Sequence, residues 1–206
     1  MNRTITAVFL LLGMASCLTG CFPEYHKARY NVEDRRILVV PFREPQIKAH
    51  SWYGWSDRGR KLTQYFKAWV SRDWSPNFVT GEESHDILKK IEDWRSNVIE
   101  PREWQRLGRD GDFDLFLIGD LVDFRVQQPE DINVYRGTSS MRYRLIHRRT
   151  GRTAFEYKLA DPATFGDLDH IPYTVLDKNG EQRIENGLLR ELAERLGKDL
   201  YGYYEE

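Results

Sequence analysis

Aspartate is the residue type in this sequence with the clearest potential for acid–base chemistry. Two facing carboxyl groups can serve as the acid and the nucleophile or base of a hydrolase, and five aspartates lie close together in the chain: Asp110, Asp112, Asp114, Asp120 and Asp123. Asp110 and Asp112 suit a turn and Asp114 suits the start of a strand, and spacing alone brings no two of the five face to face. The sequence has neither a Gly-x-Ser-x-Gly motif nor a glycine-rich phosphate loop. We therefore predict no catalytic residue.

Histidine offers a second chemistry, metal binding. None of the five histidines has the spacing of a metal motif. The tightest grouping of carboxylates with an imidazole is Asp167, Asp169 and His170, in a loop between Gly166 and Pro172. Such a group could hold a small metal or a hydrogen-bonded ligand, but aspartates in loops more often accept backbone N–H groups and form turns. We predict no metal and no cofactor.

The first 20 residues have the pattern of an export signal. Arg3 is the only charge before Glu24, and an apolar stretch runs from Ile5 to Ala15. A lone cation before a short apolar core is the plan of a secretory signal. The stretch is shorter than the roughly 20 residues that a membrane-spanning helix needs.

The segment Leu18-Thr19-Gly20-Cys21 resembles the lipobox of bacterial lipoproteins. The resemblance implies cleavage between Gly20 and Cys21 and acylation of Cys21 with chains such as palmitate. Each buried methylene contributes about 0.8 kcal/mol, so two or three chains hold a protein on a bilayer. Phe22 stands where lipoproteins retained in the inner membrane often carry Asp, which favours the outer membrane facing the periplasm. The alternative is an ordinary signal peptide or anchor helix with a chance cysteine.

Composition limits what the exported chain can be. Removing 20 of the 206 residues leaves 186, and removing Arg3 changes the formal charge from −1 to −2. This size fits one domain, and the balanced charge suggests no nucleic-acid partner. Cys17 leaves with the signal, so Cys21 is the only cysteine of the mature chain and no disulfide or thiol catalyst is expected. We predict a signal peptide at 1–20, a lipidated irregular tether at 21–34 and a single periplasmic domain at 35–206.

Aromatic side chains cluster in a loop that precedes the first expected helix. Trp52, Tyr53 and Trp55 put three large rings into four residues. Large aromatic rings are enriched at interfaces, so these three are the candidate partner-binding residues. The alternative is a loop that folds its rings over the edge of a sheet. The tyrosines near the C-terminus, at 201, 203 and 204, raise the same question.

Hydrophobic periodicity predicts an α/β (α+β) sandwich, with amphipathic helices packed on a mixed sheet. Strands are expected at 35–42, 78–80, 114–126, 141–146 and 153–159, with at most one more at 173–176. Three helices are expected to begin at the caps Asp57, Ser84 and Asn186, and a short one is expected to begin at Pro101 and end at Gly108.

The order of these elements resembles the CsgG-like lipoprotein domains, the family of the curli secretion channel. The same fold class includes lipoprotein activators of penicillin-binding proteins. The resemblance rests on Val39-Val40-Pro41-Phe42, on Asp114–Leu121 and on the hairpin Tyr143–Arg152, and it covers roughly residues 35–160. The segment 127–138 is too short and too charged for the membrane-crossing hairpins of the channel-forming member.

These observations predict a non-enzymatic, lipid-anchored module that binds a protein of the cell envelope, such as secretion or assembly machinery or a cell-wall synthase. The sequence leaves the oligomeric state open, and a homo-oligomer is among the alternatives. One alternative is an auxiliary lipoprotein of a lipid or solute transporter, which would have an apolar cleft. Another is an envelope hydrolase that uses aspartates, which would have a deep pocket with two facing carboxylates.

Overall fold

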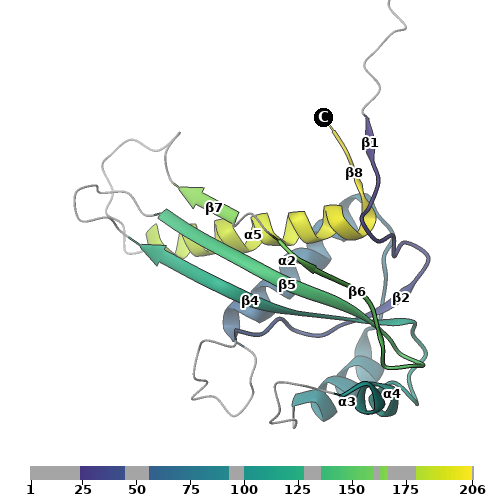
Figure 1. Cartoon of the computed structure of the whole chain (residues 1–206). Helices are drawn as coiled ribbons and strands as arrows, with labels where there is room; N and C mark the ends of the chain where they lie inside the picture. The colour runs from purple at the N-terminus through teal and green to yellow at the C-terminus, as the bar shows by residue number, and fades with distance from the viewer. Residues whose placement is uncertain are drawn as a thin grey trace, which may run out of the picture.

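The protein is an α/β sandwich, which confirms the predicted fold class. The computed structural model (Figure 1) describes residues 24–44, 56–92, 100–127, 136–159, 163–166 and 180–205. Within these ranges the elements follow the order β1(Tyr25–His26), β2(Arg36–Val39), α2(Asp57–Asp73), β3(Asn77–Phe78), α3(Gly81–Glu92), α4(Pro101–Leu107), β4(Leu115–Gln127), β5(Arg136–His147), β6(Thr153–Lys158), β7(Ala163–Gly166), α5(Gly180–Tyr201) and β8(Tyr203–Tyr204). None of the helices described is long and apolar enough to cross a membrane.

The main sheet is mixed, in the order β3-β2-β4-β5-β6. β7 pairs with residues 136–139 of β5, whereas β6 pairs with residues 142–146 of the same strand. β2 runs parallel to both β3 and β4, whereas β5 pairs antiparallel with β4, β6 and β7. The β4–β5 pairing extends over both strands and contains an irregularity between Leu121 and Asp123. A small second sheet joins β1 to β8, so the two ends of the described chain meet.

Helices cover both faces of the sheet. Alternate residues of each central strand point to opposite faces, so each strand contributes side chains to both helix layers. On β2 and β4 one set of side chains packs under α2 and α5: Ile37, Val39, Leu115 and Leu117. The other set packs under α3 and α4: Leu38, Val40, Phe116 and Ile118. A strand buried on both faces reads as a continuous apolar run, which is why both strands were predictable.

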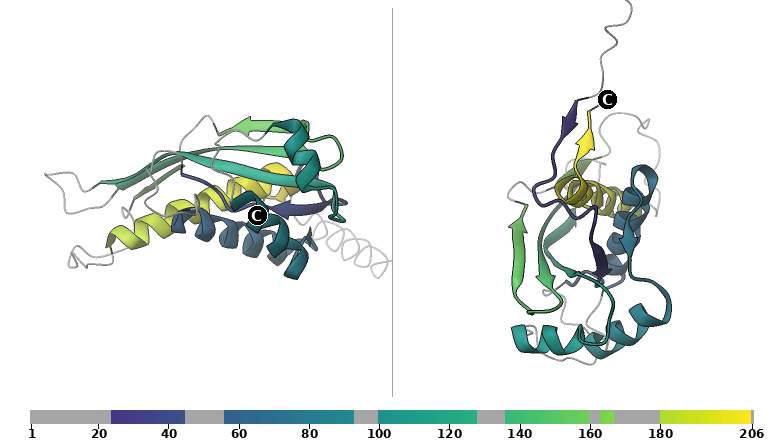
Figure 2. Two further views of the ribbon diagram at one scale, coloured as in Figure 1. Left: turned by 90° about the horizontal axis from the view of Figure 1, so that it is seen from below. Right: turned by 90° about the vertical axis from the view of Figure 1, so that its right-hand side faces the viewer.

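α2 and α5 lie side by side and run in the same direction beneath the sheet (Figures 1 and 2). Glu185, near the start of α5, pairs with Arg58 in the first turn of α2. At the other end, the ring of Tyr201 in α5 lies 6.0 Å from that of Trp74, the C-cap of α2. Gly197 makes this packing close, since a Cβ there would lie 2.1 Å from the ring of Trp69.

Several helix boundaries differ from the predictions. α2 is capped by Ser56 rather than Asp57, because the Ser56 Oγ accepts a hydrogen bond from the Gly59 N–H at 2.9 Å. α3 begins at Gly81 instead of after Ser84, and α5 begins at Gly180, ahead of the expected cap Asn186. The predicted α4, from Pro101 to a C-cap at Gly108, is confirmed.

Three strands occur where the sequence predicted none. β1 lies in the segment 21–34, which was expected to be irregular, and it pairs with β8, which lies in the tail that follows the last expected helix. β7 is likewise stabilised by pairing with β5. The strand predicted at 173–176 lies outside the described residues.

Candidate functional site

The predicted site residues lie outside the described ranges. This applies to Gly20 and Cys21 at the lipobox and to Trp52, Tyr53 and Trp55 in the aromatic loop. It also applies to the grouping Asp167, Asp169 and His170. The structure does describe the residues on either side of 45–55. It also describes β1, the strand that follows the lipobox in the chain.

An ion-pair cluster joins the two ends of the aromatic loop. Arg58 Nη1 donates to Glu44 Oε1 at 3.1 Å, and Arg58 Nε donates to Glu185 Oε2 at 2.9 Å. Lys61 Nζ pairs with the other oxygen of Glu185 at 3.1 Å. These four residues, which we call the loop base, join the residue before the loop to the first turn of α2 and to the start of α5.

Burial makes the loop base energetically significant. The Glu44 side chain is only 6% exposed, and its Oε2 has no hydrogen-bond partner within the described part of the chain. Burial alone would raise the pKa of the Glu185 carboxyl, but hydrogen bonds and charges from Arg58 and Lys61 outweigh it and lower that pKa. Burial opposes the charge of Arg58 too, yet Glu185 and Glu44 raise the pKa of its guanidinium. Arg58 and Glu185 therefore remain charged.

Backbone packing fixes the same corner. The first turn of α2 approaches the segment that follows β2 so closely that a Cβ on Gly59 would lie 1.7 Å from the carbonyl oxygen of Phe42. Thr63 Oγ1 donates to the Gly59 carbonyl at 2.9 Å, and the guanidinium of Arg58 lies 4.6 Å from the centre of the Phe124 ring. The residues on either side of 45–55 are thus held in a closely packed corner.

The aspartates considered for catalysis are engaged by arginines and backbone groups. Asp120, buried on the second face of the sheet, pairs with Arg43 at 2.7 Å and with Arg142 at 3.5 Å. Asp114 accepts the backbone N–H of Arg36 at 2.9 Å. Asp112 pairs with Arg36, and Asp123 pairs with Arg125. These contacts give the four carboxylates a structural role.

A pocket of about 380 Å³ opens near the start of β4. Its lining mixes charged and apolar side chains: Arg35, Phe113, Asp114, Leu115, His147, Arg149 and Thr150. The pocket therefore differs from the apolar cleft expected of a transporter accessory protein, and the one aspartate in its lining is held by the backbone of Arg36.

The N-terminal segment is bound along the end of α5. The backbone N–H groups of Tyr30 and Val32 donate to the carbonyls of Asp199 and Leu200 at 3.2 and 3.1 Å. The Asp199 carboxylate pairs with Arg29 at 2.7 Å and accepts the buried hydroxyl of Tyr143 at 2.8 Å. Burial, together with the charge of Asp199, raises the pKa of Tyr143, so this hydroxyl stays protonated as a donor.

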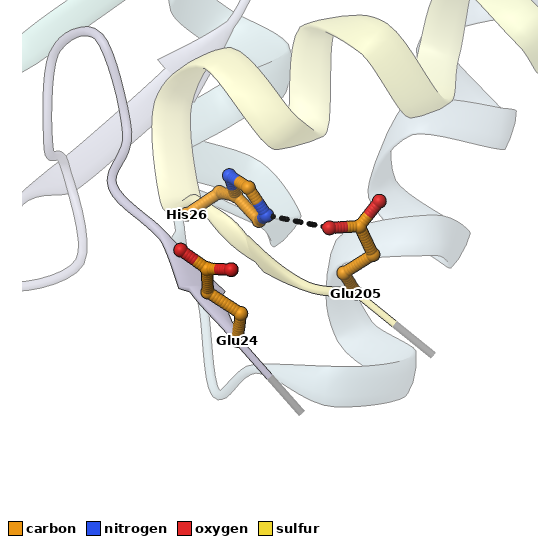
Figure 3. Close-up of side chains that lie close together, drawn as sticks. All are labelled: Glu24, His26 and Glu205. Carbon is orange, nitrogen blue, oxygen red and sulfur yellow. Dashed lines mark hydrogen bonds and ion pairs between the residues drawn. The ribbon is translucent and has the colours of Figure 1, made fainter. Parts of the chain in front are cut away.

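Glu24, His26 and Glu205 form a group of potential metal ligands on the β1–β8 ribbon (Figure 3). One ligand atom from each residue lies within 4.8 Å of the others, and His26 Nε2 lies 3.0 Å from Glu205 Oε2. The His26 ring stacks on Tyr203 with centroids 4.5 Å apart. Two carboxylates and an imidazole could hold a divalent cation, although an exposed ion pair accounts for the same geometry. Spacing cannot reveal this group, because its members come from opposite ends of the chain.

No family model matches the chain, and no curated protein matches it. Among solved structures, lipoprotein GNA1162 from Neisseria meningitidis is similar, with 13% identity, a TM-score of 0.46, and 77% of this chain and 98% of that chain covered. Protein CT253 from Chlamydia trachomatis has 11% identity, a TM-score of 0.46, and coverage of 79% and 95%. The LpoB C-terminal domain from Escherichia coli has 10% identity, a TM-score of 0.38, and coverage of 70% and 88%. The similar structures thus include a bacterial lipoprotein, but values this low assign neither a family nor a function.

Proposed function

We propose that this protein is a lipid-anchored module of the bacterial cell envelope that binds an envelope protein through its aromatic loop and catalyses no reaction. In this proposal Cys21 carries the lipid at the outer membrane, and Trp52, Tyr53 and Trp55 contact the partner. The CsgG-like resemblance supports a role in secretion, in assembly or in the activation of a cell-wall synthase, with a homo-oligomer as one form of assembly.

The observation that carries the proposal is the separation of the two ends of the sandwich. Arg58 and Glu185 hold the loop base at the start of α2 and α5. Where these helices end, Tyr25 lies 6.5 Å from Trp74 and donates to the Tyr201 carbonyl at 3.2 Å. α2 has 17 residues, and at about 1.5 Å per residue it extends roughly 25 Å. The binding loop and the membrane attachment therefore start from opposite ends of a rigid body.

Covalent geometry keeps the anchor close to the second end. Cys21 precedes Glu24 by three residues, which span at most about 11 Å when fully extended. Acyl chains on Cys21 would therefore hold β1 beside the bilayer. The loop base would then stand away from the membrane, facing other proteins.

Fractionation of cells tests the anchor. Wild type is expected in the membrane fraction with a mass that shows loss of residues 1–20 and addition of acyl chains to Cys21. A Cys21→Ser variant is expected to lose the lipid and leave the membrane fraction. A variant that stays membrane-bound and is processed like wild type would contradict the anchor.

Copurification tests the binding loop. The triple variant Trp52→Ser/Tyr53→Ser/Trp55→Ser should lose a defined envelope protein that copurifies with the detergent-extracted wild type. Arg152→Ser, an exposed change in the β5–β6 turn, is the control and should retain that protein. Identical sets of copurifying proteins from all three chains would contradict a role for the loop.

A further inference from the structure

The β1–β8 ribbon exposes aromatic surface. Among the described residues, the exposed large hydrophobic side chains are those of Tyr25 and Tyr204, with 38% and 59% of their surface accessible to solvent. The two residues are paired across the ribbon. Their ring centroids are 5.1 Å apart, and the half-buried Trp74 lies 6.5 Å from Tyr25. We call Tyr25, Trp74 and Tyr204 the aromatic patch.

The patch is held in place by the fold. β1 and β8 pair in the register Tyr25 to Tyr204 and His26 to Tyr203, and the Glu205 N–H donates to the Glu24 carbonyl at 3.0 Å. The hydroxyl of Tyr25 is fixed by its hydrogen bond to the Tyr201 carbonyl. The patch is therefore a preformed surface at one end of the molecule, where the ribbon projects from the body (Figure 2).

We propose that the aromatic patch lies in the headgroup layer of the bilayer that holds the lipid anchor. The proposal rests on the lipid anchoring put forward above, because only that attachment brings the patch to a membrane. Tyr25 follows Cys21 by four residues, so the acyl chains and the ring enter the same region. Tyr and Trp are enriched at membrane–water interfaces, where the ring meets apolar surface and the polar group meets water.

Charge at this end indicates an aromatic rather than an electrostatic contact. The cations Lys27, Arg29, Arg72 and Lys198 are accompanied by the anions Glu24, Asp73, Glu194, Asp199 and Glu205, so cations are not in excess among these residues. Arg29 is paired with Asp199 and Lys198 with Glu194. A contact that does not depend on anionic lipids should form on zwitterionic vesicles and should persist at high salt.

The test uses the lipidated protein in phosphatidylcholine vesicles with a nitroxide spin label. The sulfur of acylated Cys21 cannot react, so an added cysteine is labelled selectively. Tyr204→Cys places the label in the patch, and Lys27→Cys places it beside the patch with both tyrosines kept. Glu181→Cys, exposed at the start of α5, is the control at the opposite end.

Collision with oxygen and with a water-soluble nickel chelate reports the depth of each label. We expect vesicle binding to reduce nickel accessibility severalfold at positions 204 and 27 and to leave it unchanged at 181. If the protein floats with the vesicles but the labels at 204 and 27 stay as accessible to nickel as the label at 181, the membrane contact is wrong and the anchor stands. If the protein does not float with the vesicles, both the anchor and the contact are wrong.

Discussion

Arg58 is the residue on which the loop base depends, and Arg58→Met tests that dependence. Breaking a buried ion pair by removing one partner costs about 3–5 kcal/mol. The Arg58 side chain is 29% exposed and Lys61 still pairs with Glu185, so we expect a smaller loss of about 2–3 kcal/mol. Most of this loss comes from Glu44, whose 6% exposed carboxylate would lose the cation that pairs with it among the described residues.

Urea unfolding of the unacylated Cys21→Ser chain measures this loss. With a slope of about 2 kcal/mol per molar urea, the midpoint of Arg58→Met should fall by roughly 1–1.5 M. Arg60→Met, an exposed arginine in the same turn, is the control and should lie within about 0.5 kcal/mol of the parent. Adding Glu44→Gln to Arg58→Met should recover part of the loss, because a neutral amide replaces an unpaired buried charge. Equal midpoints for the Arg58 and Arg60 variants would show that the ion pairs of Arg58 do not stabilise the fold.

Three further predictions concern the same framework. The pKa of Glu185 is lowered in the fold, so its contribution is present above its unfolded pKa of about 4.3 and is lost as the pH falls below it. Urea titrations from pH 7 to pH 3 should show a weaker pH dependence for Glu185→Gln, and parallel curves would contradict this. Tyr143→Phe removes a buried hydrogen bond to Asp199 at 2.8 Å and should lower the unfolding free energy by about 1.5–2 kcal/mol; an unchanged midpoint would contradict that bond. Gly197→Ala would force Trp69 to move and should cost about 1–3 kcal/mol in thermal or urea unfolding, whereas a gain in stability would show that the ring yields freely.

Patterns that repeat along the chain predicted most of the sandwich. The apolar runs around Leu38 and Phe116 are buried on both faces and could hardly be anything but central strands. The spacing of Leu62, Phe66 and Val70 likewise identified the buried face of α2.

Boundaries depended on tertiary contacts that local patterns do not contain. Both Ser56 and Asp57 can cap a helix, and only the position of the Gly59 N–H decides between them. α5 begins ahead of Asn186, within a stretch that reads as a polar loop, and Ile184 in its first turns is almost fully buried. Packing of this kind overrides local propensity.

The candidate site could be predicted only in part. The lipobox and the aromatic loop are contiguous in sequence and were predicted from it, and both stay predictions because their residues lie outside the described ranges. The loop base could not, because Glu44, Arg58 and Glu185 are far apart in the chain and each reads as an ordinary solvated charge. The two-residue strands β1 and β8 have no periodicity, and only the aromatic tail at 201–204 suggested a surface.

We propose that one end of the molecule meets lipid and the other meets protein. Photo-crosslinking in living cells tests it directly, with a crosslinking amino acid at position 55 in the aromatic loop or at position 204 in β8. We expect a crosslink from position 55 to one defined envelope protein and crosslinks from position 204 to phospholipid. No protein product from position 55, or the same protein from both positions, would contradict it.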